Sequence, residues 1–128
     1  MKKIFLLSIL FVLGLGINAN AQARADIKFE KTTQNVGSFS EKQSVVNAIY
    51  VFTNTGESPL VVHEVITSCG CTVPEYSKQP IKPGEKGEIK VTYNGKGKPI
   101  GYFKKSIIVR SNATTPTTRL FIEGTMSE

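Results

Sequence analysis

The sequence contains no tryptophan, only one histidine, and only two cysteines, which a single glycine separates. Without tryptophan, and with its cysteines so close, the chain cannot form the antibody-type arrangement, in which a disulfide joins two sheets beside a buried tryptophan. One histidine and two cysteines also fall short of the four ligands of a structural zinc site, so we predict no metal and no cofactor. Beyond residue 22, no long window keeps the apolar period of a helix, which excludes helical fold classes.

One long apolar run is present, and it lies at the start of the chain. The basic head Met1-Lys2-Lys3 precedes an apolar run from Ile4 to Ile17, and Asn18-Ala19-Asn20-Ala21 follows it. This order is typical of a secretory signal peptide, and the run is shorter than the roughly 20 apolar residues of a membrane span. We predict a signal peptide over residues 1–21, with an uncleaved anchor as the alternative. Residues 22–128 then form one exported domain, periplasmic or secreted, with no stable membrane insertion.

The remaining chain alternates apolar and polar residues in short segments, which is typical of β-strands. Turn residues separate these segments, so we predict an all-β, immunoglobulin-like β-sandwich of about seven antiparallel strands, with a small barrel as the alternative. The expected strands cover residues 27–30, 36–39, 45–53, 60–66, 88–93, 103–110 and 120–122. The expected core consists of Phe29, Phe39, Tyr50, Phe52, Ile89, Val91, Phe103, Ile107, Val109, Leu120 and Ile122.

Two segments between these strands are rich in residues that form turns. Asn54, Gly56 and Pro59 belong to the run NTGESP, in which glycine, proline and asparagine each favour a turn for a different reason. The run Lys82-Pro83-Gly84-Glu85 predicts a turn with proline second and glycine third. Pro74 argues against a central strand at its position, because proline cannot donate to a β-ladder.

The stretch TSCGCTVPEY holds Cys69, Gly70 and Cys71, which are the candidate disulfide or redox residues. We expect Gly70 to adopt a φ angle closed to other residues, and so to bring the two sulfurs within reach. A bond across so small a ring restricts the unfolded chain little, which makes it a poor structural staple. Four interpretations remain open: a local disulfide that shapes the loop, two packed thiols, a redox-active or partner-pairing couple, and a soft-metal site for Cu(I).

The other candidates are basic side chains. His63 lies on the strand that leads to Cys69, where it is either an exposed surface residue or a base or ligand beside the thiols. Lys96, Lys98, Lys104 and Lys105 surround one glycine-rich connection within a chain of net charge +6. They either bind an anionic glycan or lipid headgroup, or discourage sheet-to-sheet aggregation. Outside the cytoplasm we expect no nucleic-acid partner.

Five segments, in order, resemble a bacterial family of exported domains called domain of unknown function 1573. They are VFTNTGESPLVV, TSCGCTVPEY, PIKPGEKGEIKVTYN, GYFKKSIIVRSNA and LFIEGT. The family is similar to the PapD-like, abnormal-spindle and major-sperm-protein branch of immunoglobulin-like folds. The resemblance implies a seven-stranded sandwich and implies no reaction, because the family has none established.

No recognisable catalytic arrangement accompanies these features, so we predict that the protein is not an enzyme. The sequence lacks a G-x-S-x-G motif, a recognisable pair of carboxylates and a phosphate-binding glycine loop. We expect a binding or structural module of the bacterial envelope, whose partner is another envelope protein held by a sheet face or an exposed edge strand. The alternative is a thiol–disulfide or copper-handling protein that uses the Cys-Gly-Cys element.

Overall fold

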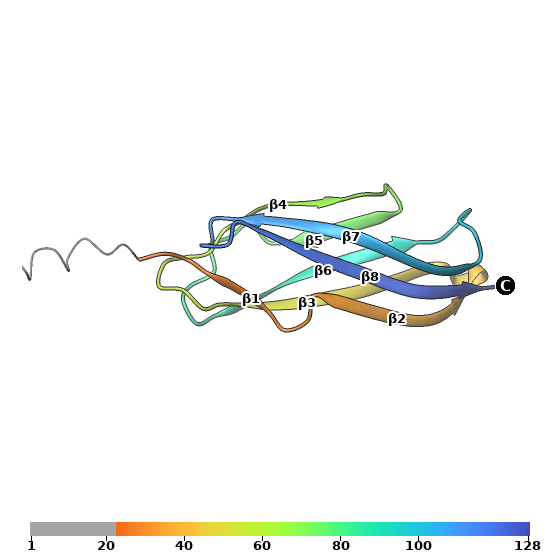
Figure 1. Cartoon of the computed structure of the whole chain (residues 1–128), viewed down its shortest axis with the longest axis horizontal. Coiled ribbons are helices and arrows are strands. Elements are labelled where there is room, and N and C mark those ends of the chain that lie inside the picture. The colour runs from red at the N-terminus through yellow and green to blue at the C-terminus, as the bar shows by residue number, and fades with distance from the viewer. Residues whose placement is uncertain (1–22) are drawn as a thin grey trace, which may run out of the picture.

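The structure, a computed structural model, describes residues 23–128, which form two four-stranded sheets packed face to face (Figure 1). The predicted signal peptide and its cleavage after Ala21 lie outside the described residues. The elements are β1 (Ile27–Phe29), β2 (Thr33–Ser40), the 3-10 turn η1 (Glu41–Gln43), β3 (Val45–Asn54), β4 (Val62–Thr67), β5 (Thr72–Tyr76), β6 (Lys86–Asn94), β7 (Gly101–Ser111) and β8 (Thr117–Ser127). Within residues 23–128, no helix is long and apolar enough to cross a bilayer.

One sheet has the strand order β1-β3-β6-β5, and the other, which faces the viewer in Figure 1, has the order β2-β8-β7-β4. The predicted immunoglobulin-like sandwich is confirmed, with two differences from the expected strands. The chain leaves the first sheet after Phe29 and crosses to the second, where β2 runs parallel to β8. The register of that pair shifts between Asn35 and Ser38, where Gly37 has a φ of 78°. The fold therefore has one parallel pair, because the chain changes sheets between β1 and β2. It has eight strands because β5 forms over residues 72–76, where no strand was expected.

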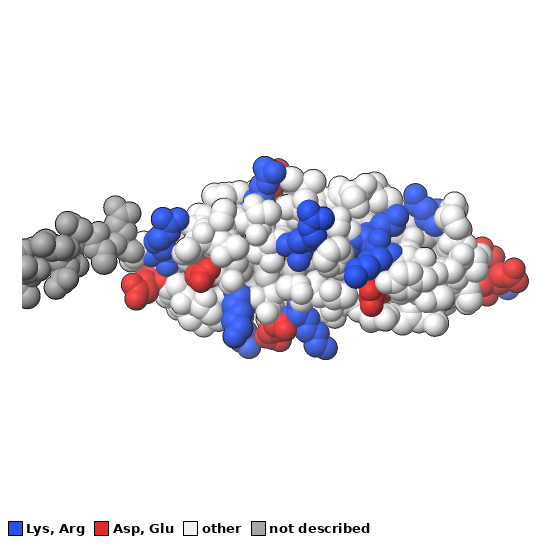
Figure 2. Space-filling model, in the orientation of Figure 1, with Lys and Arg blue, Asp and Glu red and all other residues white. Residues whose placement is uncertain are grey.

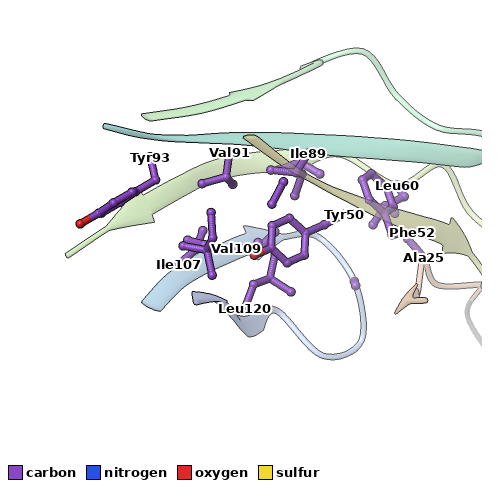
Figure 3. Packing of buried hydrophobic residues seen from close by; sticks show 14 residues of the cluster. Ala25, Tyr50, Phe52, Leu60, Ile89, Val91, Tyr93, Ile107, Val109 and Leu120 are labelled. Carbon is purple, nitrogen blue, oxygen red and sulfur yellow. The ribbon is translucent and has the colours of Figure 1, made fainter. Parts of the chain in front are cut away.

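The core lies between the inner faces of the two sheets. Figure 3 shows side chains of β3 and β6 pointing toward those of β7 and β8. Strict alternation produces this arrangement, because successive side chains of a strand point to opposite faces. The fully buried members are Tyr50, Phe52, Leu60, Val62, Ile89, Val91, Ile107, Val109, Leu120 and Ile122. Three predicted core residues, Phe29, Phe39 and Phe103, are only half-buried, because they pack against the outside of this cluster.

Asn54 joins two loops at one end of the sandwich. Its side chain is fully buried, and its amide nitrogen donates to the carbonyl oxygens of Ser58 at 2.8 Å and Ile81 at 2.9 Å. Its side-chain oxygen accepts the Gly56 amide at 2.9 Å. A Cβ at Gly56 would lie 2.3 Å from the carbonyl oxygen of Arg24, so only glycine allows the chain to approach so closely. The Asn-Thr-Gly run at residues 54–56 therefore has a structural role, which is to hold the loops together at this end of the sandwich.

The prolines and the predicted turn occupy places that suit their chemistry. Pro74 lies in the middle of β5, which is an edge strand and leaves one side of its backbone unpaired. The Glu85 amide donates to the Lys82 carbonyl oxygen at 3.0 Å, and Gly84 has a φ of 83°. The predicted proline–glycine turn is thus confirmed, and β5 pairs only with β6.

Substitution of Gly56 by alanine should destabilise the fold, because the new Cβ would collide with backbone atoms that cannot move aside. We expect Gly56→Ala to lower the free energy of unfolding by about 1–3 kcal/mol, measured by urea denaturation. Gly70→Ala is the matched control, because no atom lies within 4 Å of an added Cβ there. An equal and small effect of the two substitutions would contradict the close approach at Gly56.

The hydroxyl of Tyr50 should make stability depend on alkaline pH. It donates to the carbonyl oxygen of Phe121, and burial raises the pKa of Tyr50 above its usual range. Because the folded pKa exceeds the unfolded value of about 10, this stabilisation is present below about pH 10 and is lost as the pH rises further.

We expect Tyr50→Phe to cost about 1–2 kcal/mol at neutral pH, because the carbonyl of Phe121 loses its partner. Above about pH 10 the gap between wild type and variant should narrow, because only the wild type must keep this phenol protonated. Urea denaturation of both proteins at several pH values measures the gap. A gap that stays constant up to about pH 11 would contradict this role of Tyr50.

Candidate functional site

β4 ends at Thr67, and the chain then crosses to the other sheet through a tight turn of residues 67–72, which we call the crossover turn. The Thr72 amide donates to the Cys69 carbonyl oxygen at 3.0 Å. The Thr67 hydroxyl lies 3.2 Å from the carbonyl oxygen of Cys69 and 3.0 Å from that of Thr72. These bonds bend the chain away from β7 as soon as β4 ends.

A disulfide between Cys69 and Cys71 closes the crossover turn. The two sulfurs are 1.98 Å apart and the two Cα atoms 5.1 Å apart, within the usual range for a disulfide. Both residues are half-buried; Cys71 packs against the core, and its carbonyl oxygen accepts the Asn94 amide at 2.8 Å. Because the sequence separation is only 2, the bond restricts the unfolded chain little. Its main structural effect is to hold the local shape of the turn.

The expectation that Gly70 bends the chain through a φ angle closed to other residues is wrong. Gly70 is absent from the glycines with positive φ, and an added Cβ would meet nothing within 4 Å. The short distance between the cysteines comes instead from the turn that the Cys69 carbonyl and the Thr72 amide close. Gly70 therefore leaves open space beside the disulfide, which a larger side chain would occupy.

The structure does not bring the other predicted candidates to the cysteines. His63 is exposed near the start of β4, and Cys69 follows the end of this extended strand, so the two are far apart. Asn54 and Gly56 lie beside the Lys86 end of β6, whereas the crossover turn contacts its Asn94 end. Among the described residues, no three histidine, cysteine or acidic side chains gather as a metal site.

The departure of β4 leaves part of β7 without a neighbour. β8 pairs with β7 from Gly101 to Arg110, whereas β4 pairs with it only from Ile107 to Ser111. Residues 101–106 therefore have a strand on one side only; we call this stretch the free edge of β7. In Figure 1 this end of β7 extends beyond β4. The backbone groups on its open side have no partner in the sheet, which makes the edge a template for another strand.

A hollow of about 330 Å³ follows this free edge, and we call it the β7 groove. Tyr93 and Phe103 stack with ring centroids 4.0 Å apart, and both rings line the groove. The complete lining is Tyr93, Lys98, Pro99, Ile100, Tyr102, Phe103, Lys104 and Lys105. The groove thus combines aromatic surface with three of the four lysines singled out in the sequence. Figure 2 shows basic side chains toward this end of the face, with an acidic side chain beside them and others at the tip of the sandwich.

The lysines of the groove differ in their partners. Lys104 lies 3.9 Å from a carboxylate oxygen of Glu123, and its Nζ is 4.7 Å from the centre of the Phe121 ring. The Tyr102 hydroxyl donates to Glu123 at 2.8 Å, and this hydrogen bond raises the pKa of Tyr102. Lys98 and Lys105 have no carboxylate within ion-pair distance among residues 23–128. Two positive charges in the groove are therefore available to a ligand.

The free edge of β7 was not predicted from the sequence, although the lengths of the expected strands gave one indication of it. The strand expected over residues 60–66 is one residue shorter than the strand expected over residues 103–110. A shorter neighbour necessarily leaves part of a longer strand uncovered. Which part is uncovered depends on the pairing register of the two strands, and the sequence does not state that register.

A second hollow, of about 440 Å³, opens between the sheets beyond the end of β5. Its apolar wall includes Phe52, Tyr76 and Ile81, and its rim carries Glu75, Glu88 and Lys90. The rim combines charges of both signs, so it selects no ligand by charge as clearly as the β7 groove does.

A family model described as "Protein of unknown function (DUF1573)" matches residues 27–126. Among solved structures, a protein of unknown function from Porphyromonas gingivalis W83 is similar with a TM-score of 0.71 and 18% identity, over 84% of this chain and 50% of that one. The PapD-like domain 7 of human CEP192 has a TM-score of 0.65 and 8% identity, over 82% and 87% of the two chains. The periplasmic chaperone SfaE has a TM-score of 0.57 and 9% identity, over 80% and 58%.

These similarities show the fold and nothing finer, because all the identities are low. Among curated proteins there is no significant match. The chain spans half the length of the Porphyromonas gingivalis protein.

Replacement of Gly70 should alter access to the disulfide without altering stability. We expect Gly70→Val to change the free energy of unfolding by less than about 0.5 kcal/mol, because the position is exposed and open. Reduction by dithiothreitol, followed by thiol trapping, should become several-fold slower, because the added side chain hinders attack. Gly70→Ala is the control for the loss of glycine alone. A large loss of stability in both variants would contradict the open space at position 70.

Proposed function

This chain belongs to the DUF1573 family of proteins of unknown function, and we propose that it is an exported, non-enzymatic binding module that takes up a protein partner by strand addition. The observation that carries the proposal is the free edge of β7, residues 101–106, which lies beside a groove of its own. Strand addition needs an open backbone edge and neighbouring pockets for alternate side chains, and this region offers both.

Export to the bacterial envelope rests on three kinds of support. The first 21 residues have the order of a secretory signal peptide. The fold is similar to that of the periplasmic chaperone SfaE. At 9% sequence identity this similarity concerns the fold alone. An oxidising compartment also suits a chain whose two cysteines form a disulfide. We therefore place the partner among envelope proteins.

The groove suits binding better than catalysis because of the side chains that line it. They are aromatic rings, apolar residues and lysines. The lining contains no histidine and no carboxylate, which are the usual groups that exchange a proton near neutral pH. His63 is exposed on β4, on the part of that strand remote from the crossover turn. Stacked rings and ammonium groups hold a ligand by contact and charge, which is what a binding module requires.

Site-specific photocrosslinking in the native envelope tests the proposal. We expect benzoylphenylalanine at Tyr102, which is 64% exposed beside the free edge, to give an adduct of defined mass. The same group at Lys90, which is exposed on β6 between the neighbouring strands β3 and β5, is the matched control. An adduct at position 102 alone supports strand addition at β7. Adducts at neither position, or equally at both, would contradict it.

A second candidate function is thiol–disulfide exchange, which the open space beside Gly70 favours. In this reaction a partner's thiolate attacks the sulfur of Cys69, the bond to Cys71 breaks, and a mixed disulfide forms. The Cys71 thiolate leaves and takes a proton from water, so the sulfur of the partner is oxidised as Cys71 is reduced. Binding of Cu(I) by the same sulfurs would require prior reduction, because the disulfide removes both thiolates. The slower reduction of Gly70→Val tests whether the bond is open to attack.

A further inference from the structure

The four edge strands of the sandwich each carry a feature that hinders the addition of another strand. β1 has only three residues, and β5 contains Pro74 at its centre. β2 is interrupted by the register shift at Gly37, and β4 by a shift between Val62 and Glu64. Short length, proline and bulges are the means by which proteins protect sheet edges.

The free edge of β7 has none of these interruptions. Its register with β8 is continuous from Gly101 to Arg110, and neither proline nor a bulge occurs within it. A regular strand with an open side can pair with an extended segment through its own backbone amides and carbonyls. Residues 45–50 of β3, which pair with β6 alone, are open in the same way, and the free edge of β7 differs from them in the groove and the lysines beside it.

The charges beside this edge determine which segment it accepts. Lys105 is half-buried on the same face of β7 as Phe103, and Lys98 lies on the neighbouring connection. Neither has an acidic partner among residues 23–128. A second copy of this edge would oppose lysine to lysine, and like charges across a strand pair are destabilising. An acidic segment would instead neutralise both ammonium groups.

We infer that the β7 groove binds an extended, acidic peptide segment of a partner protein, which adds as a strand to residues 101–106. Backbone pairing with the free edge supplies the register, and carboxylates of the segment pair with Lys98 and Lys105. Apolar side chains of the segment lie against the stacked rings of Tyr93 and Phe103. The inference rests on the proposed function and names the chemical class of its partner.

Peptide titration of the 15N-labelled chain, residues 22–128, tests the inference by NMR. The first probe is a capped eight-residue peptide of repeated Glu-Glu-Val-Val, which places both residue types on each face of the added strand, and the second replaces every glutamate by glutamine. A third probe keeps the glutamates but is N-methylated at alternate residues, which removes its backbone donors. We expect the first probe to shift the amides of Tyr102 to Ser106. The glutamine probe should bind about tenfold more weakly, and the methylated probe should not bind.

Charge-reversal variants identify the lysines. Lys98→Glu combined with Lys105→Glu should weaken the glutamate peptide by at least about tenfold, and added salt should weaken its binding to the wild type. Lys28→Glu combined with Lys90→Glu is the control, because it changes the net charge equally on the other sheet. Far-ultraviolet circular dichroism and thermal melting verify that both variants fold.

Each other outcome overturns a definite part of the inference. Equal affinity for the glutamate and glutamine probes would refute the acidic class and leave strand addition intact. No probe shifting residues 101–106 would refute the groove, whereas photocrosslinking at position 102 would still decide the proposed function. In the last outcome no peptide binds, phosphatidylglycerol vesicles do bind, and Lys98→Glu with Lys105→Glu abolishes the vesicle binding. This result would show that the lysines bind a membrane surface instead.

Discussion

The burial of two apolar sheet faces against each other is the interaction on which the rest of this molecule depends. Tyr50, Ile89, Ile107 and Leu120 come from four strands and are fully buried in one cluster. Each such side chain stabilises the fold by roughly 1.5–3 kcal/mol relative to exposure, which is large against a typical total stability of about 5–15 kcal/mol. This contact therefore sets the distance between the two sheets. The loops, the hydrogen bonds of Asn54 and the crossover turn must all fit that distance.

The chain closes the two ends of the sandwich in different ways. At one end Asn54 bonds to two loop segments, which closes the sandwich with buried hydrogen bonds. At the other end the chain crosses between sheets through the Cys69–Cys71 turn, and the crossing leaves β7 longer than its neighbour. The free edge of β7 is thus a consequence of where the chain changes sheets. Lysines at strand edges generally discourage indiscriminate pairing, and in our proposal those beside this edge admit a segment of opposite charge.

Most of the sandwich was predictable from the sequence, because alternation reports which side of a strand is buried. The strands around Tyr50, Ile89 and Leu120 were all identified in this way. The parallel pairing of β2 with β8 was not, because it depends on a change of sheet between distant segments. The site was predicted only in part: the cysteines were found and their disulfide was one of four interpretations, but the role expected for Gly70 was wrong. The groove depends on the pairing register of β4 with β7, which no local pattern encodes.

Amide hydrogen exchange along β7 tests the central claim, that residues 101–106 have one open side, most directly. Backbone amides bonded in a sheet exchange slowly, and amides that face solvent exchange quickly. The account predicts that, within residues 102–106, amides directed away from β8 exchange far faster than those directed toward it. Amides of residues 107–111 should be protected on both sides, because β4 covers them. Uniform protection along the whole of β7 would contradict the account.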